Sequence, residues 1–337
     1  MDRSNFCGCK GIRTCIKCEE KFGYENKNIV EFTEHTYVYC PYCNKAWQGS
    51  NINDYQSHPN HRGNSFDIGG VYIKEDFLSH DEADTVLAAL DDLPWDKSQS
   101  GRRKQNFGPK CNFKRQKIKL GDFNGFPIGT KFIQDKFNED KVLKDFQTIE
   151  QCTLEYDSKM GSSIDNHIDD CWIWGERIVT VNIIGDSVLT LTYYEGDMNK
   201  YNLNCGCYSY EKKYLTQNSN SKENSYNNIS SPEDKSMSNN ISPPSDQLAT
   251  IPSNDGLKEF NTNPLPSVPL SKVVIRIPMP ARSLLVLYGE ARYEWQHCVL
   301  RSDVIGRRVC LAYREFTEPY LDREETREVF EKAKNFF

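Results

Sequence analysis

Three side chains in the sequence have the types that bind a transition metal in an enzyme. His167 and Asp169 are two residues apart, and His297 follows much later in the chain. In an extended chain, residues i and i+2 project to the same side, so His167 and Asp169 can ligate one ion. Two histidines and one carboxylate on one face leave open coordination positions opposite them, which is typical of a non-haem iron(II) oxygenase site. The alternatives are a surface histidine at 167 and a hydrogen-bonded core histidine at 297.

Two arginines supply a second half of the candidate site. Arg308 and Arg314 are six residues apart, so on a strand they share one face with Cys310 and Ala312, which are small. This spacing leaves room for a ligand between them. Two guanidinium groups in a protein interior are costly unless a dianion neutralises them, and they bind carboxylates bidentately. The alternative is a solvated strand face on which Arg314 pairs with a nearby glutamate.

The elements that position these residues are predicted to be mainly strands. Runs of β-branched and aromatic residues, with Gly and Pro between them, predict strands at 71–73, 178–183, 188–193, 273–277, 283–288 and 309–316. Ser79 and Glu82 form a capping-box pattern that predicts a helix after the first strand. Two groups of strands separated by a polar segment favour an antiparallel sandwich or jelly roll over βαβ units.

Composition adds limits on the class of protein. The chain has 337 residues, a net charge of -6 and no apolar run long enough to span a membrane, so we expect a soluble intracellular protein without membrane association. We expect a disordered insertion over 201–272, which is rich in Asn, Ser and Pro. The stretch 318–337 predicts a C-terminal packing helix, and its proposed buried face consists of Leu321, Phe330, Ala333 and Phe337.

Cysteines mark a separate N-terminal module, predicted over 1–60. Six of the thirteen cysteines lie within the first 43 residues. Cys15-x2-Cys18 and Cys40-x2-Cys43 have a spacing close to that of a zinc ribbon and predict a structural zinc site. Cys7, Cys9 and His35 are also available, and the alternative is a set of reduced thiols.

One segment is strongly basic within this acidic chain. Between Arg102 and Lys119 there are eight Lys or Arg residues and no acidic residue. Such a run can bind phosphates, with Arg102, Arg103 and Lys104 as the candidate substrate contacts. An ordinary surface loop and a bipartite nuclear import signal are the two alternatives.

Five runs of the sequence resemble a known enzyme family. They are CGCKGIRTC (7–15), SQSGRRKQNFGPK (98–110), HIDDCWIWGER (167–177), PARSLLVL (280–287) and RRVCLAYRE (307–315). Together they resemble the AlkB family of iron(II)- and 2-oxoglutarate-dependent dioxygenases, over most of the chain outside 201–272.

The resemblance implies a mainly β fold with flanking helices: a double-stranded β-helix (jelly roll, cupin-like) over 65–200 and 273–317. It implies Fe(II), 2-oxoglutarate and O2 as cofactors, with His167, Asp169 and His297 as iron ligands. By the same resemblance, Arg308 holds the distal carboxylate of 2-oxoglutarate, Arg314 lies near its keto-acid end, and Tyr156 contacts it. Two departures are visible in the sequence, because the family's Asn-x-Tyr is Leu154-Glu155-Tyr156 here and its Asn-x-Thr is Cys310-Leu311-Ala312.

The implied reaction is oxidative N-demethylation. The branch of the family that this chain resembles is associated with two substrates, monomethylated lysine in actin and DNA adenine methylated on its exocyclic nitrogen. We therefore expect actin or another methylated protein, or DNA, as partner, and a cytoplasmic and nuclear location. The rival hypothesis is a catalytically idle jelly roll that binds actin or nucleic acid. A metal-dependent cupin of another chemistry is disfavoured, because it does not need Arg308 and Arg314 together.

Overall fold

The structure is a computed structural model that describes residues 7–26, 29–205 and 268–337. The described elements all belong to one compact unit, formed by 1–212 and 269–337. Most of the predicted insertion, 201–272, lies outside the described residues. Within the part of the chain that the structure describes, no helix combines the length and the apolar character that a membrane crossing requires.

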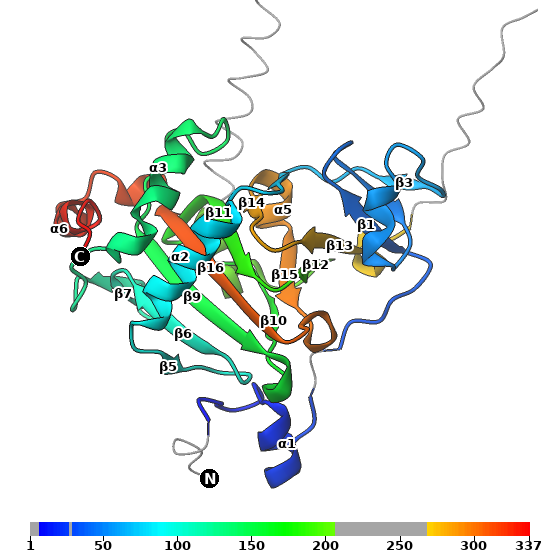
Figure 1. Cartoon of the computed structure of the whole chain (residues 1–337), viewed down its shortest axis with the longest axis horizontal. Coiled ribbons are helices and arrows are strands. Elements are labelled where there is room, and N and C mark those ends of the chain that lie inside the picture. The colour runs from blue at the N-terminus through cyan, green and yellow to red at the C-terminus, as the bar shows by residue number, and fades with distance from the viewer. Residues whose placement is uncertain (1–6, 27–28, 206–267) are drawn as a thin grey trace, which may run out of the picture. The chain divides into compact units, whose positions relative to one another are not determined.

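Two seven-stranded sheets form the core, and we call them sheet I and sheet II (Figure 1). Sheet I has the order β10 (Ile164–His167), β15 (Trp295–Val299), β12 (Ser187–Tyr193), β13 (Val274–Met279), β1 (Thr36–Cys40), β2 (Lys45–Gln48), β3 (Ser65–Phe66). Sheet II has the order β4 (Val71–Lys74), β14 (Leu284–Leu287), β11 (Trp174–Ile184), β16 (Arg307–Phe316), β9 (Glu150–Asp157), β6 (Arg103–Phe107), β5 (Asp96–Lys97).

Pairing between neighbouring strands is antiparallel in both sheets, except that β1 runs parallel to β13. A separate hairpin joins β7 (Lys110–Asn112) to β8 (Lys117–Lys119). The consecutive strands β11 and β12 lie in different sheets, and Gly185 lies in the turn between them with a φ of +76°. A side chain there would meet the Arg307 carbonyl oxygen at 2.6 Å from its Cβ, so the turn requires glycine. The core is a double-stranded β-helix, as the sequence predicted.

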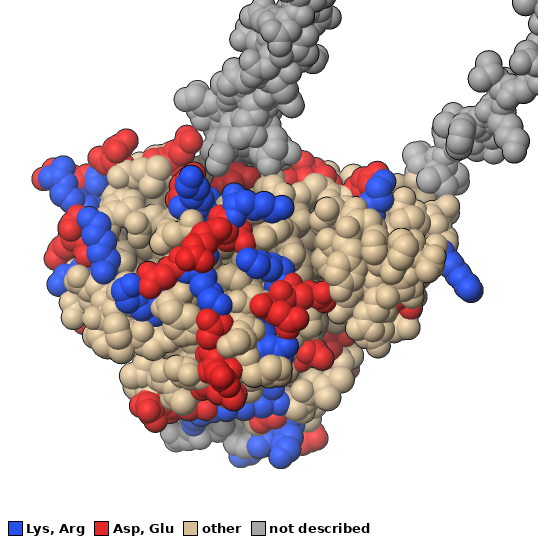
Figure 2. All heavy atoms as spheres, turned by 45° about the horizontal axis from the view of Figure 1, so that its top comes forward, with Lys and Arg blue, Asp and Glu red and all other residues tan. Residues whose placement is uncertain are grey.

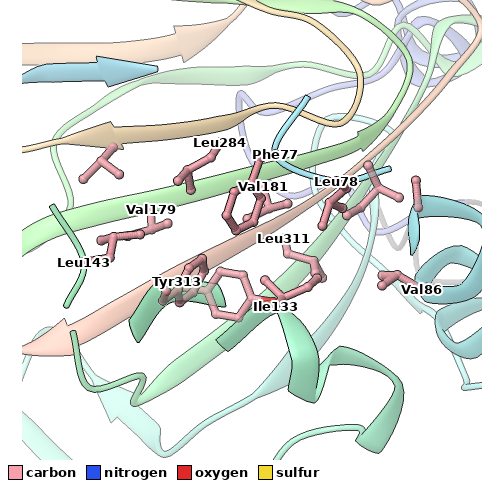
Figure 3. Packing of buried hydrophobic residues seen from close by; sticks show 14 of the residues in the cluster. Phe77, Leu78, Val86, Ile133, Leu143, Val179, Val181, Leu284, Leu311 and Tyr313 are labelled. Atoms are coloured by element: carbon pink, nitrogen blue, oxygen red, sulfur yellow. The ribbon is translucent and has the colours of Figure 1, made fainter. Parts of the chain in front are cut away.

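Helices cover one face of sheet II. The helices α2 (His80–Asp91) and α3 (Lys131–Glu139) pack on β11, β14 and β16 through one apolar cluster (Figure 3). Val309, Leu311 and Tyr313 of β16 belong to this cluster. The intervening residues of β16 therefore face the other way, into the space between the sheets. The predicted capping box of Ser79 and Glu82 is present at the start of α2.

The remaining elements are short. They are α1 (Ile16–Phe22), η1 (Ile52–Ser57), η2 (Ile128–Thr130), η3 (Ser158–Met160), η4 (Met198–Tyr201), η5 (Leu270–Lys272), α5 (Gly289–Tyr293), η6 (Arg301–Asp303), η7 (Glu318–Tyr320) and α6 (Glu324–Lys332).

The C-terminal helix is shorter than the predicted stretch 318–337. Pro319 lies in the 3-10 turn η7, and α6 spans only Glu324–Lys332. Leu321 and Phe337 are 47% and 54% exposed, so the prediction that they share a buried helical face is wrong. Both residues lie outside α6, where helical periodicity no longer decides which side they face.

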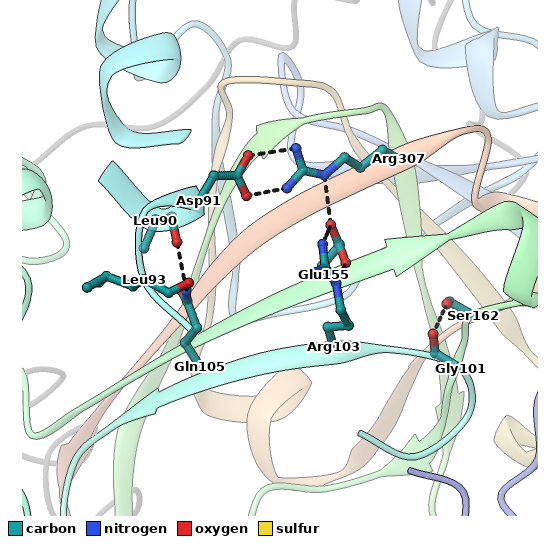
Figure 4. A network of polar contacts seen from close by, with 9 residues as sticks. All are labelled: Leu90, Asp91, Leu93, Gly101, Arg103, Gln105, Glu155, Ser162 and Arg307. Atoms are coloured by element: carbon teal, nitrogen blue, oxygen red, sulfur yellow. Dashed lines mark hydrogen bonds and ion pairs between the residues drawn. The ribbon is translucent and has the colours of Figure 1, made fainter. Parts of the chain in front are cut away.

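Glu155 ties sheet II to the helix that covers it. Its carboxylate is 8% exposed and accepts hydrogen bonds from Arg103 of β6 and from Arg307 of β16 (Figure 4). Arg307 also donates to both carboxylate oxygens of Asp91 at the end of α2, at 2.9 and 2.5 Å. Burial acts to raise the pKa of Glu155, but the two guanidinium groups outweigh it and hold that pKa below its usual value.

We expect Glu155→Gln to lower the free energy of unfolding by about 2 kcal/mol at pH 7, because two arginines lose a buried charged acceptor. A carboxyl group whose pKa is lowered by folding stabilises the fold at pH values above its unfolded-state pKa. That stabilisation is lost as the pH falls through the folded-state pKa. The difference between wild type and variant should therefore shrink below about pH 4. Urea unfolding at pH 7 and at about pH 3 measures both effects.

Asp135→Asn is the matched control. Asp135 pairs with Lys131 at 2.7 Å, but both side chains are about half exposed, at 58% and 47%. Its loss should cost less than about 0.5 kcal/mol. Equal losses for the two variants would contradict the structural role of Glu155.

Candidate active site

The three predicted metal ligands converge. His167 of β10 and His297 of β15 are cross-strand partners, and Asp169 follows two residues after His167. One ligand atom from each lies within 4.8 Å of the other two. His297 Nε2 is 3.5 Å from Asp169 Oδ2, and the two imidazole centroids are 4.3 Å apart. The pairing of two neighbouring strands therefore creates the site.

The protonation states of these groups suit a cation. Burial lowers the pKa of His167 and lowers that of His297 to about 3, so both rings are neutral near pH 7. His167 Nδ1 lies 2.8 Å from the Asp165 carbonyl oxygen, so its proton there leaves the Nε2 lone pair for a metal. Burial acts to raise the pKa of Asp169, but Arg314 and the two histidines hold it below its usual range.

Asp169 also carries a free acceptor. Its Oδ2 atom is buried and makes no hydrogen bond within the described residues. An ionised oxygen buried without a partner is unfavourable, and a bound cation would satisfy it. The donor set of two imidazoles and one carboxylate therefore fits the iron(II) that the sequence predicts.

Two arginines fix the orientation of Asp169, Arg292 from a buried position and Arg314 from a partly buried one. Arg314 Nε donates to its Oδ1 at 2.7 Å, and Arg292 Nη1 donates to its backbone carbonyl at 2.8 Å. Arg314 Nη1 also donates to Glu150 Oε2 at 2.5 Å. Arg314 thus holds a metal ligand and pairs with a glutamate, which is the pairing that the alternative interpretation foresaw, although in a buried setting. Sequence reasoning missed Arg292 and Glu150.

Arg308 is the arginine with unused hydrogen-bonding capacity. It is 1% exposed, its Nε donates to Asn182 Oδ1 at 2.9 Å, and its Nη1 atom has no partner. No carboxylate lies within ion-pair distance of it among the described residues. The Asn182 amide is fixed in turn, because its Nδ2 donates to three backbone carbonyls. A buried cation without an anion is costly, so this site fits the carboxylate of a ligand such as 2-oxoglutarate.

Tyr156 lies beside Arg308, as expected for residues that pair across β9 and β16. The Arg308 guanidinium carbon is 4.8 Å from the centre of the Tyr156 ring, which is 2% exposed. Cys310 and Ala312, both buried, separate the two arginines on the inner face of β16.

A pocket of about 410 Å³ opens onto His167 and Asp169. Trp174 and Asp170 line it beside His167 and Asp169. Other lining residues are Arg13, Arg102, Phe113, Lys200 and Tyr201. Cations and aromatic rings therefore share the wall of this pocket.

Some lining residues lie where they were not expected. Tyr201 lines the pocket, and Asn202 Nδ2 donates to Asp170 Oδ1 at 2.7 Å, so placing the start of the insertion at residue 201 was wrong. Arg13 reaches the pocket from the cysteine-rich segment and pairs with Asp165 at 3.4 Å. Arg13 belongs to the run 7–15 that carries the family resemblance, so its sequence signal was present but unused.

The three basic candidates for substrate contact are separated by the structure. Arg102 lines the pocket, Arg103 points away from it to Glu155, and Lys104 is not among the lining residues. Neighbouring residues along an extended chain face opposite sides, so Arg102 and Arg103 do not contact the same ligand. The basic segment is also more than a loop, because it forms β6, β7 and β8.

The N-terminal cysteines form two sets. Cys7, Cys9, Cys15 and Cys18 are all buried and converge, whereas Cys40 and Cys43 converge with His58 and His61. The prediction of a single site from Cys15, Cys18, Cys40 and Cys43 is therefore wrong. Each C-x2-C pair has two partners close to it in the chain, and pair spacing alone cannot distinguish that arrangement from a ribbon. His35 belongs to neither set.

The sequence was compared with known proteins. No protein-family model matches the chain. A human protein named "Alpha-ketoglutarate-dependent dioxygenase alkB homolog 4" is 32% identical over 318 residues, which cover 93% of this chain and 87% of that protein. A mouse protein of the same name is 32% identical over 322 residues. A Caenorhabditis elegans protein named "DNA N6-methyl adenine demethylase" is 30% identical over 342 residues, 97% of this chain and 91% of that protein.

A solved structure titled "The structure of OsALKBH1" covers 74% of this chain with 9% identity and a TM-score of 0.38, which is too distant to add to the assignment. The sequence relatives are sufficient, because they match at 30% identity or more over nearly their whole length. The chain belongs to the AlkB family of alpha-ketoglutarate-dependent dioxygenases, and it is an oxidoreductase.

Proposed function

We propose that this enzyme removes N-methyl groups by oxidation, with His167, Asp169 and His297 holding iron(II) and Arg308 holding the distal carboxylate of 2-oxoglutarate. Two unsatisfied atoms carry the proposal: the Asp169 Oδ2 acceptor and the Arg308 Nη1 donor are both buried without a partner. The chemistry supplied by bound iron(II), 2-oxoglutarate and dioxygen is hydroxylation of the methyl carbon, with succinate and carbon dioxide as co-products. The hydroxymethyl amine then separates into formaldehyde and the free amine.

The chain's own residues hold the metal ligand Asp169 and the carboxylate-binding Arg308 in fixed orientations. Arg314 and Arg292 hold Asp169, so that its Oδ2 points to the two imidazoles without rearrangement. Arg308 is fixed by Asn182 and stacks on Tyr156, and its free Nη1 supplies a charge-assisted hydrogen bond. Arg314 has two of its nitrogen atoms engaged by Asp169 and Glu150, so we assign it to positioning the metal ligand.

Anaerobic addition of iron(II) and 2-oxoglutarate should give a visible charge-transfer band in the wild-type chain, and air should then yield succinate. Asp169→Asn should abolish both signals, because the only carboxylate ligand is lost. His80→Ala is the control, since His80 lies in the capped first turn of α2 and should leave both signals unchanged. A wild-type chain that folds but never gives the band would favour the idle binding module.

Arg308→Met should weaken 2-oxoglutarate binding on the order of 100-fold, the equivalent of one lost charge-assisted hydrogen bond. Titrating the charge-transfer band with 2-oxoglutarate measures this. Arg307→Gln is the matched control, because the neighbouring Arg307 faces Asp91 and Glu155 instead. Equal weakening in both variants would remove Arg308 from the site.

Two substrates are candidates. DNA adenine methylated on its exocyclic nitrogen is supported by the name of the C. elegans relative and by the cations Arg13, Arg102 and Lys200 around aromatic rings. Monomethylated lysine, as in actin, comes from the family resemblance, and Asp170, Trp174 and Tyr201 offer a carboxylate and rings for a cation.

Charge on the face drawn in Figure 2 favours a local contact over a broad one. Figure 2 shows Lys, Arg, Asp and Glu interspersed over the face that it draws. The net charge of -6 agrees with this view. We therefore assign nucleic-acid binding, if DNA is the substrate, to the cations at the pocket.

Arg102→Ala should weaken binding of single-stranded methyladenine DNA and reduce the slope of log K against log salt by about 0.7, as expected for one lost phosphate contact. Formaldehyde release from a methyl-lysine actin peptide should change less. Arg115→Ala is the control, because Arg115 is an exposed cation of the same basic segment. If both variants weaken DNA binding equally, the segment acts as a broad patch and the role of Arg102 is wrong.

Three further assignments complete the proposal. We assign a structural zinc ion to the four buried thiols of Cys7, Cys9, Cys15 and Cys18, since four converging cysteines match a closed tetrahedral site. The cytoplasm and nucleus are the proposed locations, and actin or DNA the proposed partner. Both follow from the family resemblance and the basic segment.

A further inference from the structure

We propose that Cys40, Cys43, His58 and His61 bind a second structural zinc ion, in a Cys2His2 site of their own. This site shares no residue with the iron triad or with the four-cysteine set, and it does not depend on the dioxygenase activity. One ligand atom from each of the four residues lies within 4.8 Å of the other three.

A tight hairpin brings the two thiols together. Cys40 ends β1, and β2 begins at Lys45, so Cys43 lies in the turn between paired strands. Asn44 has a φ of 56° and donates its backbone N–H to the Cys40 carbonyl at 2.9 Å. This is a knuckle that presents two sulfur atoms to one point.

A second turn brings the imidazoles to the same point. The 3-10 helix η1 ends at Ser57, and the Asn60 N–H donates to the Ser57 carbonyl at 2.7 Å. His58 lies within this turn, and His61 follows directly after it. His58 Nδ1 is 3.8 Å from Cys40 Sγ. Ligands of a tetrahedral zinc ion lie about 3.6 Å apart for sulfur and nitrogen and about 3.8 Å apart for two sulfurs.

Trp47 contacts two of the four proposed ligands, Cys43 and His61. Trp47 Nε1 donates to Cys43 Sγ at 3.3 Å, a contact that stabilises a thiolate. The Trp47 ring stacks on His61 with centroids 4.8 Å apart and 19° between planes, which fixes the imidazole. His61 Nε2 is buried and has no hydrogen-bond partner. A zinc ion would account for the convergence of the four ligand atoms and for the unpartnered His61 nitrogen.

The ion would fasten a loop that has little other support. Residues 49–64 run from the end of β2 to β3 and contain η1 as their only regular element in the structure. The buried apolar residues beneath them are few: Val38, Cys40 and Tyr55, with Trp47 and Ile52 at their edge. Because β1 pairs with β13, the clip attaches this loop to sheet I, which carries both iron-binding histidines further along.

Zinc per chain should be counted in the full-length protein after dialysis against EDTA, which strips metal from an open three-ligand site. Wild type should retain two zinc ions, and His58→Ala with His61→Ala should retain one. His35→Ala is the control and should retain two zinc ions, because His35 belongs to neither cluster. Asp169→Asn should also keep both ions, which separates this result from the fate of the proposed dioxygenase activity.

X-ray absorption at the zinc edge of the wild-type chain tests the ligands without a mutation. Two filled sites should average about three sulfur and one nitrogen ligand per zinc, because one site is all-thiolate and the other is mixed. If the double variant fails to fold, His61→Cys should keep two ions and gain sulfur ligands. One zinc ion with four sulfurs in the wild type, no zinc at all, or an unchanged count in the double variant would overturn the proposal, whereas one ion with two sulfurs and two nitrogens would support it and leave the four-cysteine set empty.

Discussion

The ionised carboxylate of Asp169, buried between the two sheets, is the constraint on which the rest of the site depends. It is stable there because Arg314 donates to it, and Arg314 is neutralised in turn by Glu150, its cross-strand partner on β9. Sheet II thus supplies the charges that hold the carboxylate. Sheet I supplies the two imidazoles as a cross-strand pair. The catalytic geometry is therefore a consequence of how the sheets face each other, and no loop has to move to create it.

Charge also distinguishes the two arginines that looked equivalent in the sequence. Arg314 is engaged by two carboxylates, whereas Arg308 is held by a neutral amide and keeps a donor free. A guanidinium that is already paired with carboxylates contributes little binding free energy to a ligand. A buried guanidinium without a carboxylate partner contributes much more when an anion binds. Both arginines occupy the positions that the family resemblance implies. This chain has Cys310 and Ala312 where the family has polar side chains, and Asn182 supplies one polar contact to Arg308 in their place.

Local patterns predicted the fold well, and contacts between distant segments explain what they missed. Strand 188–193, the helix cap at Ser79 and the alternation along β16 depend on neighbours in sequence, and the structure confirms them. His167, Asp169 and His297 were predicted from their residue types together with the arginine pair and the family resemblance. The partners of Cys15 and Cys40 and the orientation of Arg103 were not predictable, because each depends on which segment folds against it. Tyr201 was assigned to the polar insertion by composition, yet its ring lies in the pocket wall.

The N-terminal segment contains the four converging cysteines and also lines the pocket through Arg13. Arg301 donates to both carboxylate oxygens of Glu19 in α1 at 2.8 Å and thereby fastens that helix to the core. Among the described strands, β10 is an edge strand of sheet I and pairs with β15 alone. An ion shared by His167 and His297 would cross-link that edge. Without that cross-link, the edge strand would be more open to pairing with another chain.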